Sequence, residues 1–193
     1  MSKRLFIIHG WSGYPEEGWL PWLKGELEKQ GWLVFVPQMP NAQEPRIEAW
    51  VKAINREVRE IDSETYFIGH SMGCQAIIRF LEREESLLLS GGAIFVAGFL
   101  DSLTNIGNSD LEVSAVKEWL KTPIDFELIR RRLKKSIAIF SDNDPFVPLS
   151  NQFSFKRELN SSIIIQNDAQ HFSGSTGTVE LPIVKELVLS LAE

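Results

Sequence analysis

The stretch YFIGHSMGC (residues 66–74) places a serine between two glycines, at the point where an apolar run breaks off. Tyr66 to Ile68 are aromatic or β-branched, which is typical of the end of a strand. From Cys74 onward the apolar residues recur with the spacing of a buried helix face. The sequence therefore predicts a strand-to-helix turn over residues 69–73, with Ser71 inside it.

Five further short apolar runs surround this turn, and most are continuous, as expected when both faces of a parallel strand are covered. The six runs are Leu5–Ile8, Trp32–Val36, Tyr66–Ile68, Ala93–Ala97, Ile137–Phe140 and Ile163–Ile165. Segments with helical spacing lie between or after them: Trp22–Gln30, Ile47–Ile61, Cys74–Glu84, Val113–Leu120, Asp125–Leu133, Gln152–Leu159 and Val179–Leu191. The alternation predicts one α/β domain over residues 1–193, with a doubly wound, mostly parallel six-stranded sheet flanked by helices.

Composition narrows the classes of partner. The net charge of −6 disfavours nucleic acid and anionic membrane surfaces, which require a basic stripe to neutralise phosphates. The single cysteine excludes an internal disulfide, and the first ten residues lead straight into a strand-like run without a signal-peptide pattern. We expect a cytoplasmic protein that binds neither nucleic acid nor membrane.

The loops that follow the predicted strands carry the chemistry. In open α/β sheets the ligand binds outside the carboxyl ends of the strands, so residues from these loops meet at one edge. Ser71 is the candidate nucleophile, because a hydroxyl on a sharp turn is exposed to a base and to substrate. Gly69 and Gly73 let strand and helix approach closely, and the N–H of Met72 at the helix start is a candidate oxyanion donor.

The base follows by elimination among three histidines. His9 belongs to the loop after the first strand. The side chain of His70, next to the nucleophile, is expected to point away from Ser71. This leaves His171, which follows the last strand and can swing its ring toward Ser71.

Three aspartates lie on loops that could supply the acid. Asp144 is favoured because the prolines of residues 144–148 stiffen the turn and remove donors that would compete for the carboxylate. Asp142 stays an alternative, with turn chemistry or capping as its other reading, and Asp168 could help fix the loop of His171. The chosen carboxylate would select the histidine tautomer and stabilise the imidazolium.

The loop after the first strand should supply a second oxyanion donor and part of a pocket. Gly10 allows backbone close to the site, so the N–H of Trp11 is the first candidate and that of Ser12 the next. Trp11 and Phe172 are expected to be pocket walls, because both adjoin proposed catalytic positions.

Two more side chains are assigned to the pocket: His70, and more weakly Phe146. Cys74 is expected to be a small buried hydrophobe rather than a nucleophile. The chain shows neither a histidine pair with metal-ligand spacing nor a glycine-rich dinucleotide or phosphate loop, so we expect no metal and no cofactor.

With these motifs the chain resembles the α/β-hydrolases and, among them, the small serine hydrolases of the retinoblastoma-binding-protein-nine/YdeN type. The resemblance covers nearly all of the chain and is carried by Leu5–Gly13, Trp19–Leu23, Pro40-Asn41, Gly69–Gly73, Pro123–Phe126, Ser141–Pro148 and Ala169–Phe172. It implies Ser71 as nucleophile, Asp144 as acid and His171 as base, on a compact six-stranded core without a large lid. Two features depart from the family. No Leu-x-Cys-x-Glu segment surrounds Cys74, so retinoblastoma-type binding is not inferred, and the segment Phe99–Leu120 differs from the family pattern.

The sequence thus predicts a metal-independent serine hydrolase that cleaves small carboxylic esters or related acyl compounds through an acyl-enzyme. One alternative is an aminopeptidase or amidase acting on small peptides, which needs a carboxylate near the pocket; the pair Glu16-Glu17 is the candidate. Another is a non-catalytic binding protein that keeps the fold. The physiological substrate, any protein partner and the oligomeric state stay open.

Overall fold

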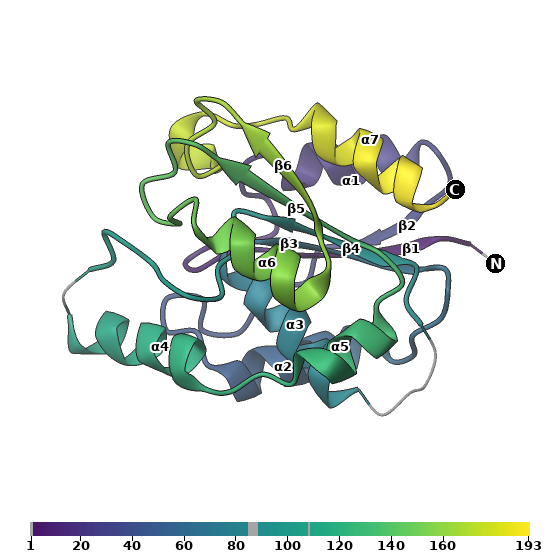
Figure 1. Cartoon of the computed structure of the whole chain (residues 1–193). Helices are drawn as coiled ribbons and strands as arrows, with labels where there is room; N and C mark the ends of the chain where they lie inside the picture. The colour runs from purple at the N-terminus through teal and green to yellow at the C-terminus, as the bar shows by residue number, and fades with distance from the viewer. Residues whose placement is uncertain (1, 85–88, 108) are drawn as a thin grey trace.

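A computed structural model describes residues 2–84, 89–107 and 109–193. Six strands form one sheet in the order β2-β1-β3-β4-β5-β6, and every neighbouring pair is parallel (Figure 1). The strands are β1 (Arg4–Ile8), β2 (Leu33–Phe35), β3 (Thr65–His70), β4 (Gly92–Val96), β5 (Ser136–Ser141) and β6 (Ser162–Gln166). All six predicted strands are confirmed, and the sheet is wholly rather than mostly parallel.

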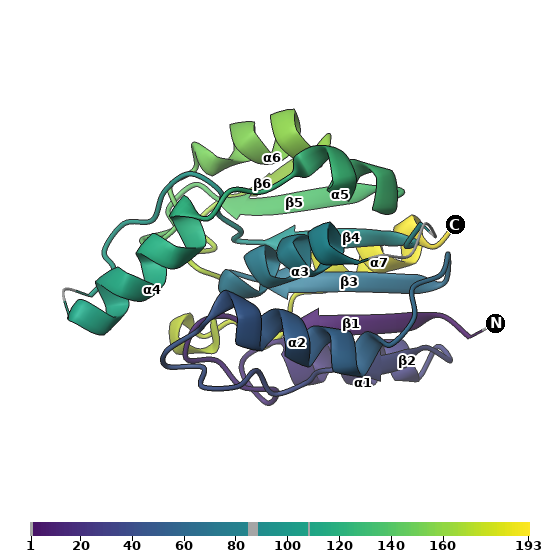
Figure 2. The same cartoon turned by 90° about the horizontal axis from the view of Figure 1, so that it is seen from below.

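Within the described residues, seven α-helices and one 3₁₀ turn connect and cover the strands. They are α1 (Leu20–Glu28), α2 (Ile47–Val58), α3 (Met72–Arg83), α4 (Asp110–Lys121), α5 (Phe126–Arg132), α6 (Asn151–Leu159), η1 (Gly174–Thr176) and α7 (Pro182–Leu191). Helices α1 and α7 cover one face of the sheet, and α2, α3 and α5 cover the other (Figures 1 and 2). The predicted doubly wound α/β architecture is confirmed. None of the described helices combines the length and apolar character needed to cross a membrane.

The observed end of α2 differs from the end that the apolar spacing predicts, because the backbone conformation changes there. The spacing predicts a helix through Ile61, but α2 ends at Val58 because Arg59 adopts a positive φ of 59°. Ile61 is still fully buried, so it belongs to the same core without belonging to the helix. The hydrophobic pattern therefore identified the buried face correctly and placed the end of the helix too late.

The sheet order brings the loop after β1 next to the loop after β3, which carries Ser71. From β1 the chain passes to β2 at one edge, whereas β3 lies on its other side, so the loops after β1 and β3 diverge at a topological switch point. Ile8 pairs with Gly69, which brings Gly10 level with Ser71. A Cβ atom built on Gly10 would lie 3.1 Å from the Cβ of Ser71.

Candidate active site

Ser71 occupies the tight turn between β3 and α3 in a strained conformation. Its φ of 53° and ψ of −117° fall in a region that residues with a side chain rarely adopt. Two backbone bonds hold the turn: the N–H of Ser71 donates to Val96 O (2.9 Å), and its carbonyl accepts from the N–H of Cys74 (3.0 Å). These bonds thus hold Ser71 in its strained conformation at the carboxyl end of β3.

The two glycines of this turn are required by close packing. A Cβ atom on Gly69 would lie 2.5 Å from the backbone nitrogen of Cys74, and one on Gly73 would lie 2.1 Å from the carbonyl oxygen of Ile8. Both distances are shorter than non-bonded atoms tolerate. The glycines therefore allow α3 to begin against the ends of β1 and β3.

Asp144 and His171 are joined by a short hydrogen bond. The Nδ1 of His171 lies 2.8 Å from Oδ2 of Asp144, and the two side chains are 12% and 2% exposed. The other carboxylate oxygen accepts the N–H groups of Phe146 (2.8 Å) and Val147 (3.0 Å). The prolines were expected to remove donors that compete for this carboxylate; two N–H groups of the same turn still bind it, on the oxygen that does not face the histidine.

Such a pair can prepare the imidazole as a base. With Nδ1–H donated to the carboxylate, the Nε2 of His171 keeps its lone pair. A histidine in that tautomer can take a proton from a hydroxyl and later return it to a leaving group.

The loop that carries His171 is strained and is held by the turn that carries Asp144. Its residues alternate into positive φ, at Asp168 (53°), Gln170 (48°) and Phe172 (51°). Three consecutive side chains of the acid turn accept successive N–H groups of this loop: Ser141 Oγ from Ala169 (3.1 Å), Asp142 Oδ1 from Asp168 (2.9 Å) and Asn143 Oδ1 from Gln170 (2.8 Å). The carboxylate of Asp142 thus binds the loop backbone, whereas that of Asp144 binds the imidazole.

Two backbone N–H groups are free to stabilise an oxyanion. Within the described residues, neither the N–H of Trp11 nor that of Met72 has a protein acceptor; Met72 is the first residue of α3, where helical N–H groups lack partners. The second candidate from the first loop, Ser12, donates its N–H to Ala42 O (2.8 Å) and is not available.

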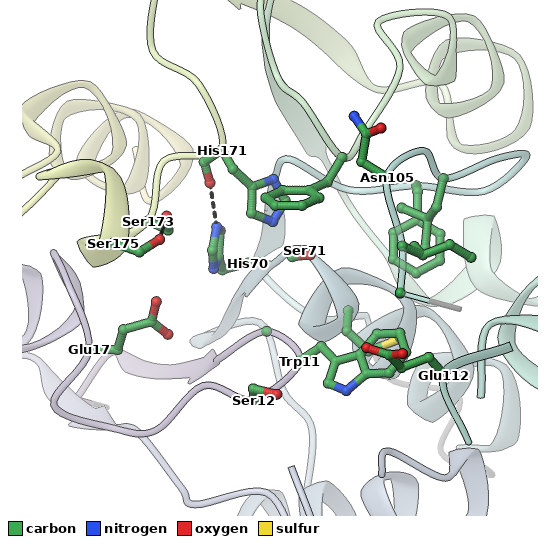
Figure 3. A pocket seen from close by; sticks show the side chains of 17 residues that line it. Trp11, Ser12, Glu17, His70, Ser71, Asn105, Glu112, His171, Ser173 and Ser175 are labelled. Atoms are coloured by element: carbon green, nitrogen blue, oxygen red, sulfur yellow. Dashed lines mark hydrogen bonds between the residues drawn. The ribbon is translucent and has the colours of Figure 1, made fainter. Parts of the chain in front are cut away.

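His70 is buried beside His171 and holds its backbone. The Nε2 of His70 donates to the carbonyl of His171 (2.8 Å), as the dashed line in Figure 3 marks, and the two ring centroids are 5.0 Å apart. Burial, followed by the positive charge that His171 can carry, lowers the pKa of His70 to about 3. His70 therefore remains neutral, and its ring is engaged with the loop of His171.

A cavity of about 350 Å³ opens over these groups (Figure 3). Ser71 and His171 lie between a polar end, which includes Glu17 and two serines, and an end with apolar walls. Glu17, Ser173 and Ser175 lie at the polar end, and Trp11, Asn105 and Glu112 lie at the other side of Ser71 (Figure 3). The apolar part of the lining consists of Trp11, Phe99, Leu103, Ile106 and Phe146. Gly10, His70 and Met72 also line the cavity.

Part of the wall comes from the segment of residues 99–120. The structure describes residues 99–107 and 109–120 of it, which include nearly all of α4. This helix begins with a capping box between Ser109 and Glu112 and extends beyond the carboxyl edge of the sheet (Figure 2). Glu112 lines the cavity, and its hydrogen bonds with Ser109 lower its pKa. This segment therefore contributes to the shape of the apolar end, together with Trp11 and Phe146.

Phe172 does not line the cavity, so its prediction as a pocket wall is wrong. Its side chain is fully buried in the core under α1 and α7, and its carbonyl accepts the indole N–H of Trp19 (2.8 Å). Its neighbour His171 faces the cavity. The positive φ values in this loop direct the two rings to different sides, which adjacency in the sequence does not reveal.

Sequence reasoning missed Ser173 and Ser175 at the polar end and named Glu17 only as one of a pair. Of the pair considered as an acidic site, Glu16 is exposed, while Glu17 lines the cavity. Burial raises the pKa of Glu17, partly offset by His171 and by the N–H of Gly174. The run of small polar residues after Phe172 was an available signal for Ser173 and Ser175.

Cys74 is structural, as expected. Its thiol is fully buried and donates to Gly69 O (3.1 Å), and burial raises its pKa. In the described part of the chain, no three His, Cys, Asp or Glu side chains come together in a group that could hold a metal ion.

Comparison with known proteins gives consistent matches over the whole chain. A family model described as serine hydrolase matches residues 5–190. The sequence is 31% identical over 190 residues to YdeN of Bacillus subtilis (strain 168), covering 98% of this chain and 96% of that protein. It is 25% identical over 172 residues to serine hydrolase RBBP9 of Rattus norvegicus, covering 89% and 87%.

Solved structures agree with these matches. The crystal structure of the B. subtilis ydeN gene product superposes with a TM-score of 0.90 at 30% identity, covering 98% of both chains. An esterase domain from a Rhodothermus marinus protein reaches a TM-score of 0.69 at 12% identity, covering 98% of this chain and 86% of that one, which shows a shared fold.

Proposed function

The chain belongs to the serine hydrolase family, and from this premise we propose that it hydrolyses small carboxylic esters or related acyl compounds through an acyl-enzyme. The observation that carries the proposal is the 2.8 Å bond between His171 and Asp144 at a cavity that Ser71 also lines. A nucleophile, a base and a group that orients the base are the parts that such chemistry needs.

In the proposed mechanism, Ser71 Oγ attacks the substrate carbonyl while Nε2 of His171 takes its proton. Asp144 holds the imidazole in the required tautomer and stabilises the imidazolium. The N–H groups of Trp11 and Met72 bind the oxyanion of the tetrahedral intermediate. Collapse expels the alcohol, which receives the proton from His171, and a water molecule then attacks the acyl-enzyme by the same sequence of transfers.

The cavity supports small substrates. Its volume of about 350 Å³ is near the lower end of the range of roughly 300–1,000 Å³ typical of ligand sites. The apolar walls around Trp11, Leu103 and Phe146 suit a short acyl or aromatic group on one side of Ser71. The polar end suits a partner group that forms hydrogen bonds.

One observation favours a second candidate, hydrolysis of amino-acid esters or amides. The carboxylate of Glu17 lines the cavity with His171 and Ser71, where it could bind a substrate ammonium. This candidate predicts that Glu17→Gln lowers kcat/KM for an amino-acid ester much more than for its N-acetylated counterpart. Equal effects on the two substrates would leave the simple ester as the better proposal.

The first test is labelling with a fluorophosphonate, read by intact mass and peptide mapping. Wild type should gain one adduct at Ser71, because only an activated serine attacks the phosphorus, and Ser71→Ala should gain none. Ser12→Ala is the matched control, since Ser12 lines the same cavity without a proposed role as nucleophile, and it should label fully. A folded wild type that stays unlabelled would refute the hydrolase proposal and favour a binding protein with this fold.

Hydrolysis of p-nitrophenyl acetate tests the coupling between the groups. Ser71→Ala and His171→Ala should each reduce kcat about as much as the double variant does, because a nucleophile and its base act as a unit. Losses that multiply in the double variant would show that the two residues act independently.

A further inference from the structure

His9 is a buried histidine next to the cavity that the proposed mechanism does not use. It follows β1, its side chain is fully buried, and its ring packs edge-on against Trp50 with centroids 5.6 Å apart. Both ring nitrogens have partners within hydrogen-bond distance. Nδ1 lies 2.9 Å from the carbonyl oxygen of Gly10, and Nε2 lies 2.9 Å from the backbone nitrogen of Met39.

These partners determine the tautomer. The N–H of Met39 can only donate, so Nε2 of His9 must be the acceptor and carry no proton. The side-chain amide of Gln38 lies on the same nitrogen at 3.2 Å, as a second donor. Nδ1 therefore carries the hydrogen and donates it to the carbonyl of Gly10. Burial lowers the pKa of His9, so the ring stays neutral and keeps this arrangement.

The carbonyl that His9 binds belongs to the same peptide unit as a proposed oxyanion donor. The plane contains the C=O of Gly10 and the N–H of Trp11, which point in opposite directions in a trans peptide. That carbonyl also accepts the N–H of Gly13 (3.1 Å). Two donors thus fix the carbonyl on the His9 side, and the N–H of Trp11 must face the other way.

This peptide lies close to the nucleophile. Gly10, Trp11 and Ser71 line the same cavity, and a Cβ atom on Gly10 would be in tight contact, 3.1 Å, with the Cβ of Ser71. If the peptide plane rotated, the carbonyl oxygen of Gly10 could turn toward the site, where it would repel an oxyanion. The orientation of this peptide plane therefore decides whether the site presents the Trp11 N–H, which would stabilise an oxyanion, or the Gly10 C=O, which would repel it.

We propose that His9 is a positioning residue for catalysis: its Nδ1–H holds the Gly10 carbonyl and thereby aims the Trp11 N–H at the oxyanion. This inference rests on the proposed hydrolase function and assigns to that site a residue outside the nucleophile, base and acid. His9 acts through the backbone and touches no substrate.

A pair of variants separates its two hydrogen bonds. In His9→Asn the amide nitrogen takes the place of Nδ1, which preserves the donor to Gly10 and loses the acceptor for Met39. In His9→Gln the amide reaches the place of Nε2, which preserves the acceptor and loses the donor. With p-nitrophenyl acetate, His9→Gln should lower kcat about 10- to 100-fold with KM little changed, since loss of a whole oxyanion donor costs roughly 10²–10³. His9→Asn should stay within about threefold of wild type.

A tetrahedral inhibitor gives a readout that a merely structural role would not move. The affinity for a trifluoromethyl ketone, whose serine adduct carries an oxyanion, should fall in His9→Gln by the same factor as kcat/KM. Circular dichroism and thermal unfolding establish that both variants fold. Equal activity in the two variants, or an unchanged inhibitor affinity, would overturn the proposal.

A measurement on wild type alone tests the proposal if a variant fails to fold. Nitrogen-15 NMR of the imidazole should show His9 protonated on Nδ1 and unprotonated on Nε2 at neutral pH, and the opposite tautomer would overturn the proposal. A wild type that neither labels nor hydrolyses esters refutes the hydrolase function and this inference with it. A fully active wild type with indistinguishable variants refutes only the role of His9.

Discussion

Asp142 and Asp144 lie two residues apart in one turn, and their hydrogen bonds predict opposite responses to the same substitution. Asp144→Asn should lower kcat roughly 10³- to 10⁴-fold, because an amide NH₂ facing Nδ1 of His171 favours the wrong imidazole tautomer. Asp142→Asn keeps the Oδ1 that accepts the N–H of Asp168, so its kcat should stay within a few fold of wild type. Ester hydrolysis by the two purified variants, with circular dichroism for folding, measures this difference.

The reverse result, an inactive Asp142→Asn with an active Asp144→Asn, would assign the acid to Asp142. A large loss in both variants would indicate that the whole turn, rather than one carboxylate, positions His171.

The candidate residues differ in how far the sequence could identify them. Ser71 and His171 follow from residue type and from their place after predicted strands, which the topology then brings to one edge. Phe172 could not be placed in this way, because its direction depends on a positive φ that no residue preference predicts. Glu17 required knowledge of which side of a loop faces the cavity, which only the folded chain provides.

At the scale of elements, the contact between α3 and the end of β1 depends on one glycine. Gly73→Ala should lower the free energy of unfolding by roughly 3 kcal/mol, since its Cβ would meet the carbonyl of Ile8 at 2.1 Å and neither backbone can yield easily. Gly25→Ala in α1 is the matched control. A Cβ there meets nothing within 4 Å, so alanine should stabilise the helix by about 0.5–1 kcal/mol.

Urea unfolding of both variants checks this contrast. If Gly73→Ala were as stable as wild type, the packing of α3 against β1 would be looser than the structure has it. A destabilised Gly25→Ala would mean that the solvent-facing side of α1 has contacts beyond those described.

The order of elements was predictable because each strand and helix buries a patterned face. Continuous apolar runs predict strands covered on both sides, and the 3.6-residue spacing predicts the buried side of each helix. Element ends were less predictable, since they depend on single backbone conformations such as that of Arg59. The start of α4 is an exception that the pattern Ser109-x-x-Glu112 could have revealed, because it is a capping box.

For the whole molecule, two buried histidines predict loss of stability in mild acid. Burial lowers the pKa of both His9 and His70, in the latter case to about 3, whereas the unfolded value is 6.5. Below pH 6.5 the unfolded chain binds protons at these histidines more readily than the folded protein does, so stability falls as pH falls. Their contribution is complete above pH 6.5. The slope well below that pH should approach about 1.4 kcal/mol per pH unit for His70, and His9 adds to it in the same direction.

Urea unfolding at pH 7, 6 and 5 tests this expectation. This pH range lies above the unfolded-state pKa of glutamate, 4.5, so most glutamates stay ionised within it. Glu17 acts in the opposite sense, because its raised pKa makes the folded state bind a proton more readily, but its partial exposure keeps that effect small. Wild type should lose stability steadily from pH 6.5 to pH 5, and His9→Asn should show a shallower slope because one of the two buried imidazoles is gone. A flat profile for wild type over this range would mean that the folded protein protonates these rings as readily as the unfolded chain does, and would contradict their burial as neutral groups.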